Sequence, residues 1–123
     1  MRDPEVNLST EALAICQVLL NHQRSILRAA ERPPFKQCLL TYRDVCEGAG
    51  LPLLIQSVST CLWEIAEFCA DNEWPPLNAL VVNSKTHEPG KVYDKAPGCS
   101  LKSWREEAQC CLDYAHYPDL ITA

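Results

Sequence analysis

Cysteine is frequent in this chain and is the first residue type to consider as a nucleophile or metal ligand. Eight cysteines occur, at positions 16, 38, 46, 61, 69, 99, 110 and 111. No two of them have the two-residue gap that is typical of zinc knuckles and thioredoxin-like redox sites. Cys61 and Cys69 fall within a helical pattern, where cysteine packs as a small hydrophobic residue. We therefore expect reduced, mostly buried cysteines; disulfides in a secreted fold and a metal site are the alternatives.

Carboxylates and histidines offer no clear catalytic set. Glu64 and Glu67 are three positions apart in a predicted helix, but no histidine or metal ligand is close to them in sequence, so a solvated acidic face is expected. His22, His87 and His116 are too scattered to form an obvious ligand set. Four glycines leave little room for a phosphate-binding loop. We expect no catalytic residue, no metal site and no cofactor.

Basic and uncharged polar side chains are the other candidates for a functional surface. Arg24, Arg28 and Arg32 are four positions apart and would share one helix face, either for phosphate or acidic-partner contacts or as a solvated face. Lys85 would lie on a polar loop. A later predicted helix carries an uncharged polar face that is typical of a contact surface, formed by Gln56, Ser57, Ser59 and Thr60.

The charge of the chain is unevenly distributed. The 123 residues carry a net charge of −5 at pH 7, and residues 44–73 contain six acidic side chains and no basic one. This argues against an indiscriminate polyanion binder. No apolar run reaches the roughly 18 residues of a membrane span, and no signal-peptide pattern is present. We expect a cytoplasmic protein without a membrane partner.

The spacing of apolar residues predicts one domain over residues 1–123, mainly α with a small β component. A helix over 9–32 begins at the N-cap Ser9. A helix over 100–117 ends the domain, and its Ser103 and Glu106 have capping-box spacing.

Residues 41–95 form the predicted centre of the domain. A short helix begins near Thr41, Gly50 ends it, and a longer helix follows. The apolar segment 77–83 is expected to be a buried strand that returns at 92–93 as a hairpin. A short helix, a tight turn, a second helix and a hairpin are the layout of a winged helix-turn-helix.

Three short motifs accompany this layout. Thr41-Tyr42 opens the short helix, Ala49-Gly50-Leu51-Pro52 forms the turn, and Val81-Val82 ends the strand. In this order and spacing they resemble the C-terminal domain of alkylguanine-DNA alkyltransferases and of their catalytically silent alkyltransferase-like relatives. Residues 75–83 also resemble a set of small uncharacterised bacterial and phage-borne proteins. The resemblance implies a winged-helix domain that associates with DNA, with Tyr42 at a position that touches the DNA backbone.

The chain departs from the family at its functional positions. The alkyltransferase strand ends in Pro-Cys-His-Arg-Val-Val, and its cysteine accepts the alkyl group. Aligning Val81-Val82 with that ending places Asn78 at the cysteine and Ala79 at the histidine. An amide is not a nucleophile, so the resemblance implies no alkyl transfer. Gln56 stands where the family has the arginine that replaces an extruded base.

Two non-catalytic functions remain open. In the first, the domain is a DNA-associated module, of a type found in mobile elements, that binds double-stranded DNA. Its candidate contacts are Tyr42, Arg43, Gln56, Ser57, Thr60, Lys85, Arg24 and Arg28. In the second, it is an inhibitor or adaptor that binds a basic protein through Glu64, Glu67 and Asp71. The resemblance favours DNA, and the acidic segment favours a protein.

Overall fold

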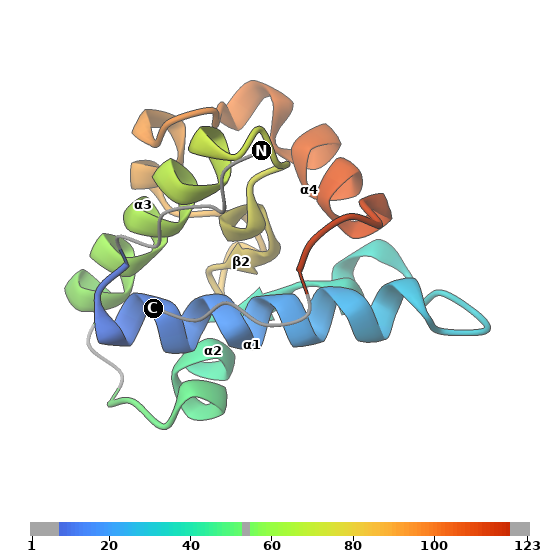
Figure 1. Ribbon diagram of the computed structural model, residues 1–123, viewed down its shortest axis with the longest axis horizontal. Helices are drawn as coiled ribbons and strands as arrows, with labels where there is room; N and C mark the ends of the chain where they lie inside the picture. The colour runs from blue at the N-terminus through green and yellow to red at the C-terminus, as the bar shows by residue number, and fades with distance from the viewer. Residues whose placement is uncertain (1–7, 53–54, 119–123) are drawn as a thin grey trace.

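The computed structural model describes residues 8–52 and 55–118, with the backbone alone for residues 55, 56, 91 and 92. This part of the chain is mainly helical, with four α-helices and one two-stranded sheet. Helix α1 (Thr10–Leu27) lies across the molecule, with α2 on one side and α3, α4 and β2 on the other (Figure 1). The mainly α class predicted from the sequence is confirmed.

Helix α1 begins where the sequence predicts and ends earlier. The Ser9 hydroxyl accepts a hydrogen bond from the Ala12 amide, which caps the helix. The predicted end at residue 32 was wrong, because the helix stops at Leu27. Residues 28–32 are exposed, so a helix there would bury no apolar face, and burial of such a face is what stabilises most protein helices.

Helix α2 (Tyr42–Ala49) is fixed at both ends by local contacts. The Thr41 hydroxyl accepts from the Asp44 amide at 3.1 Å, and the Asp44 carboxylate accepts from the Thr41 amide at 3.0 Å, which together form a capping box. Gly50 ends the helix with a left-handed φ of 70°. These contacts confirm the predicted short helix and its glycine stop, and they hold Tyr42 at the end of strand β1 (Leu40–Thr41).

The predicted hairpin was wrong. Leu77–Leu80 form the 3₁₀ helix η2, and Val81–Val82 form β2, which pairs in parallel with β1. The segment expected to return as a strand lies in the 3₁₀ helix η3 (Lys91–Lys95). The buried backbone of β2 finds its partner in β1, so no antiparallel strand follows it within the described ranges.

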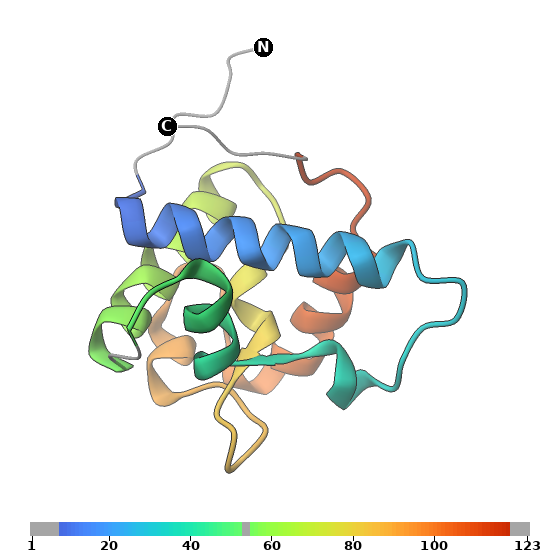
Figure 2. The same cartoon turned by 90° about the horizontal axis from the view of Figure 1, so that it is seen from below.

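The loop between β2 and η3 is closed by its own backbone. The Asn83 amide donates to the Glu88 carbonyl at 2.8 Å, and the His87 amide donates to the Asn83 carbonyl at 2.8 Å. Figure 2 shows this loop projecting from the body of the molecule. It has no strand ladder, so the winged helix-turn-helix layout predicted from the sequence is not confirmed.

Helix α3 (Ile55–Asp71) and helix α4 (Trp104–Asp113) complete the core. The 3₁₀ helices η1 (Phe35–Cys38) and η4 (Leu101–Ser103) precede β1 and α4. The C-terminal helix is shorter than the predicted 100–117, and Ser103 makes no side-chain cap, so the expected capping box is absent.

The cysteines are free thiols, as predicted. All eight are unpaired, and six are buried: Cys16, Cys38, Cys46, Cys61, Cys69 and Cys111. Burial raises the pKa of Cys16 and of Cys69 to about 12. These thiols are therefore protonated at neutral pH and act as small hydrophobic residues of the core.

Candidate functional site

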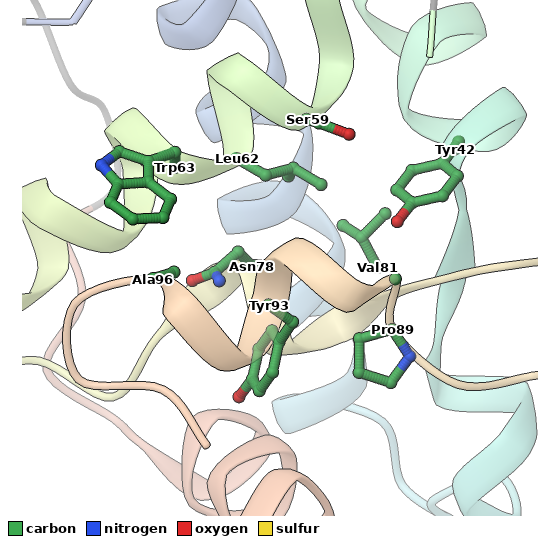
Figure 3. Close-up of a pocket in the computed structure, with 10 residues that line it drawn as sticks. Tyr42, Ser59, Leu62, Trp63, Asn78, Val81, Pro89, Tyr93 and Ala96 are labelled. Carbon is green, nitrogen blue, oxygen red and sulfur yellow. The ribbon is translucent and has the colours of Figure 1, made fainter. Parts of the chain in front are cut away.

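A pocket opens where α2, α3, η2 and η3 meet. Its empty space measures about 320 Å³ including the open mouth, and the centre of a water molecule fits in about 20 Å³ of it. Figure 3 shows the side chains that surround it. They are Tyr42, Ser59, Leu62, Trp63, Asn78, Val81, Pro89, Gly90, Tyr93 and Ala96.

Asn78 forms the inner end of this pocket. It lies in η2, where every residue is buried, and only 3% of its surface is exposed. Its Nδ2 donates to the Cys99 sulfur at 3.5 Å. Its Oδ1 is buried and has no hydrogen-bond partner. Because buried polar atoms are almost always paired, an unpaired acceptor beside a pocket is a feature that requires an explanation.

The amide of Asn78 faces the space between α3 and η3. Figure 3 shows it beside Ala96, with Trp63 and Tyr93 on either side. Trp63 is half-buried, and its indole Nε1 donates to the Glu67 carboxylate at 2.7 Å. The pocket therefore combines one buried acceptor with apolar and aromatic walls.

Tyr42 and Gly90 approach each other closely at another wall. A Cβ added at Gly90 would stand 2.7 Å from the Tyr42 hydroxyl oxygen. Any larger residue here would therefore displace the Tyr42 hydroxyl, and the constraint is one of space alone, since the φ of −67° at Gly90 is accessible to any residue. The close approach brings the loop before η3 against the first residue of α2.

Tyr93 is held by a partly buried network of hydrogen bonds. Its hydroxyl donates to the Glu107 carboxylate, which also accepts from the Ser100 amide at 3.2 Å. Burial, with help from Glu107, raises the pKa of the Tyr93 phenol. The phenol therefore stays protonated, and its proton is donated to Glu107. Tyr93 contributes only the flat face of its ring to the pocket.

Cys99 lies next to Asn78, although 21 positions separate them in the chain. Its thiol donates to the Pro97 carbonyl at 3.5 Å. Burial raises the pKa of Cys99, while the hydrogen bond from Asn78 acts in the opposite direction. A protonated thiol is a poor nucleophile.

The sequence-predicted DNA contacts are divided among different places. Tyr42 lines the pocket, and Arg43 follows it, exposed on α2. Lys85 is exposed in the projecting loop. Ser57 and Thr60 are exposed but border a separate groove beside the start of α1. Gln56 lies in the first turn of α3, and its side chain is outside the described residues.

The predicted arginine face is wrong. Arg24 donates to the Pro118 carbonyl at 3.2 Å, so it holds the C-terminal segment. Arg28 is exposed at the end of α1. Arg32 lies beyond the helix and forms an ion pair with Asp113. Because α1 ends before Arg32, the regular spacing no longer places the three side chains on one face.

Two residues of the predicted acidic face are engaged within the chain. Glu64 accepts from the amide and the hydroxyl of Ser9, at 2.9 and 3.0 Å. Glu67 accepts from the Trp63 indole. Asp71 is exposed at the end of α3. The acidic segment therefore has a structural role in part, because Glu64 fixes the start of α1 against α3.

Sequence reasoning did not find Asn78, Cys99 and Tyr93 as one site. One signal was present, because Asn78 is the polar residue in a run of apolar ones from Leu77 to Val82. A polar side chain in a buried segment needs a partner or a function. Its neighbours Tyr93 and Cys99 come from η3 and the segment after it, which the sequence did not predict to pack around Asn78.

In comparisons with known proteins, no family model matches the chain, and no curated protein or solved structure matches it significantly. Within residues 8–52 and 55–118, no group of three or more His, Cys, Asp or Glu side chains is arranged to hold a metal ion. None of the described helices is long and apolar enough to cross a membrane.

Proposed function

We propose that this chain is a non-catalytic DNA-associated module that receives an unpaired or extruded base in the pocket around Asn78. The observation that carries the proposal is the buried, unpartnered Oδ1 of Asn78 in a pocket with aromatic walls. Proteins that take a base out of the stack hold it between aromatic or apolar side chains and bind its edge by hydrogen bonds. Both elements of such a site are present here.

The walls suit a flat heterocycle. Trp63 and Tyr93 lie on either side of the Asn78 amide, and Leu62 and Pro89 add apolar surface (Figure 3). In the structure the pocket is too narrow for a base. Entry therefore requires a wall to move, and Trp63 suits this role because it is half-buried and its indole contact to Glu67 is on the surface.

Exposed cations accompany the segments that form the pocket. Arg43 follows Tyr42, Lys95 precedes Ala96, and Lys85 lies in the loop that ends at Gly90. Two nearby carboxylates, Asp44 and Asp94, accept backbone amide hydrogens of Thr41 and Leu101. Three phosphate contacts would give a modest salt dependence, with a log–log slope of about −3.

The chemistry of the inner residues supports the non-catalytic part of the proposal. Asn78 has no nucleophilic atom, and the pKa of the adjacent Cys99 is raised by burial. Nucleophilic catalysis needs a thiolate or an adjacent base that removes the proton. The protein-binding alternative has less support, because Glu64 and Glu67 already have partners within the chain.

The test is a titration of the full chain against two fluorescent duplexes, one perfectly paired and one with a single bulged guanine. We expect the bulged duplex to bind about tenfold more tightly, because one base then needs no unpairing. Arg43→Ala and Lys85→Ala should each reduce the salt slope by about one, whereas Arg28→Ala, an exposed cation outside the pocket segments, should not.

Two results would contradict the proposal. The first is no binding of either duplex up to about 100 µM protein, the weak end of non-specific DNA binding. The second is equal affinity for the paired and the bulged duplex. If the first is found, reversal of Asp71 to lysine in a pull-down becomes the test of the basic-protein alternative.

A further inference from the structure

We propose that the groove beside the start of α1 binds a small amphiphilic cation, an amine that carries an apolar chain or ring. The groove is formed by the first half of α1, the end of α2 with the turn after it, and the first half of α3. Among the described residues, none lines both this groove and the pocket around Asn78. A ligand in the groove is therefore independent of the proposed DNA function.

The groove is large enough for a ligand as the structure stands. Its empty space measures about 940 Å³ including the open side, and the centre of a water molecule fits in about 470 Å³ of it. The pocket around Asn78 has about 20 Å³ by the same measure. Sites for small molecules usually have volumes of about 300–1,000 Å³. A short apolar chain therefore enters the groove without displacing a wall.

The floor of the groove is apolar. Ile15 and Val58 line it with 1% and 2% of their surfaces exposed. Cys46 and Cys61 also line it, and burial raises the pKa of both thiols, so they are uncharged at neutral pH. Leu51 adds half-buried apolar surface from the turn after α2. A ligand gains affinity by covering such a surface, in proportion to the apolar area that it removes from water.

Two carboxylates from different helices border this apolar floor. Glu64 on α3 is half-buried and accepts from the amide and the hydroxyl of Ser9, at 2.9 and 3.0 Å. Glu11 is exposed in the first turn of α1, and no hydrogen bond or ion pair of its side chain is found within the described ranges. The charges of Glu64 and Glu11 add to the effect of burial in raising the pKa of Cys61. The negative field of both carboxylates therefore reaches the floor of the groove.

The segments around the groove supply no cation to these carboxylates. The two stretches that line it, residues 9–15 and 46–64, contain no lysine or arginine. The ion pair in the described part of the chain, Arg32 with Asp113, lies beyond the other end of α1. The starts of α1 and α3 each contribute roughly half a positive charge, which is less than the charge of the two carboxylates together. The groove therefore favours a ligand that carries a positive charge.

A small ligand fits the groove better than a second protein. Stable protein interfaces cover about 800 Å² on each partner and have an apolar centre. Here the polar side chains of Ser57 and Thr60 are exposed at the border of the groove. The large hydrophobic side chain that is exposed in the described ranges is Leu101, which does not line the groove. The apolar surface is thus confined to the recess, where a chain or ring of small size reaches it.

The experiment compares three probes with the same six-carbon chain: hexylamine, hexanol and hexanoate. Each is titrated into the full chain at pH 7, up to about 20 mM, because such short chains bind in the millimolar range. Binding is followed by NMR through the methyl groups of Ile15 and Val58. We expect hexylamine to bind about five- to tenfold more tightly than hexanol, and hexanoate to bind most weakly, because at this pH the amine is a cation and hexanoate an anion.

Two variants test the source of this preference. Glu11→Gln should remove most of the difference between hexylamine and hexanol, because it removes a charge and keeps the shape of the side chain. Glu106→Gln is the matched control. Glu106 is an exposed carboxylate in the first turn of α4, it does not line the groove, and its variant should keep the full preference.

Each part of the proposal has a result that overturns it. If hexylamine shifts neither methyl signal, the groove is not a binding site. If hexanol or hexanoate binds as tightly as hexylamine, the groove does not select a cation. A preference that is undiminished in Glu11→Gln, or reduced equally in Glu106→Gln, overturns the role of Glu11. None of these measurements uses DNA, so their failure leaves the proposed function as it stands.

Discussion

Two amide side chains are buried in the described part of the chain, and their surroundings are opposite. Gln23 lies at the junction of α1 and α4, where its Nε2 donates to the carbonyls of Cys111 at 2.9 Å and Tyr114 at 2.7 Å. Asn78 lies at the pocket, where its Nδ2 meets only a sulfur and its Oδ1 meets nothing. One amide satisfies backbone carbonyls, and the other has an acceptor without a hydrogen-bond partner.

The two amides differ because only one of them forms hydrogen bonds to backbone groups. The last carbonyls of a helix have no partner within the helix, and Gln23 supplies one for the end of α4. No backbone group depends on Asn78 in the same way. An unsatisfied buried polar atom destabilises a fold by about 1–3 kcal/mol, so the fold gains little from keeping Asn78.

The largest expected effect is the loss of Gln23. Gln23→Ala should lower the free energy of unfolding by about 2–4 kcal/mol, because it leaves buried carbonyls unpaired and opens a cavity. Urea denaturation measures the change. Gln17→Ala is the matched control: Gln17 is also on α1, but it bonds to Asn21 near the surface, and its loss should stay within about 0.5 kcal/mol. Equal losses of stability in the two variants would show that Gln23 has no special role in the fold.

Gly90→Ala should affect binding at the pocket more than the stability of the fold. The new methyl group forces only the hydroxyl end of Tyr42 to move, so we expect a loss of stability of about 1 kcal/mol. Binding of a bulged duplex should weaken severalfold, because this wall shifts. Gly50→Ala gives a matched loss of about 1 kcal/mol through its left-handed φ, far from any neighbour, and should leave binding unchanged. If both variants bind alike, the Tyr42 wall is not part of the site.

The ion pair of Arg32 and Asp113 should contribute least to the junction that Gln23 holds. The hydrogen bond from Arg32 lowers the pKa of Asp113 below 3.8. The stabilisation is therefore present above pH 3.8 and is lost as the pH falls through the lower, folded pKa. Both side chains are at least one-third exposed, so Asp113→Asn should lower stability by no more than about 0.5 kcal/mol at pH 7. A larger loss would show that charge, rather than Gln23, secures α4.

Local signals in the sequence predicted the elements that local contacts determine. Ser9, the helix start near Thr41 and Gly50 all act through neighbours within four positions, and the structure confirms each of them. The ends of the terminal helices were predicted wrongly, because those ends depend on tertiary contacts. Residues 28–32 are exposed and have nothing to pack against. After Asp113, the carbonyl of Tyr114 accepts a hydrogen bond from the Gln23 side chain.

The site was predicted less well than the fold, for a related reason. Asn78 was identified only as a position where a nucleophile is missing. Its hydrogen-bond partner Cys99 is 21 positions away. Tyr93 was expected in a strand, and no local pattern in Lys91–Lys95 indicates a 3₁₀ helix packed on α3. Glu64 was interpreted as a surface charge because Ser9, its partner, is 55 positions away.

The most direct test of this account is the free energy of unfolding of Asn78→Leu, measured without DNA beside Gln23→Leu. Leucine has nearly the shape of asparagine and is one methylene shorter than glutamine, and it removes the polar atoms of each amide. Because Oδ1 of Asn78 has no partner, we expect Asn78→Leu to be as stable as the unaltered protein, within about 0.5 kcal/mol, or more stable. We expect Gln23→Leu to lose about 2 kcal/mol or more, since it leaves carbonyls unpaired. A comparable loss in Asn78→Leu would show that Asn78 serves the fold, and would contradict its assignment to a ligand.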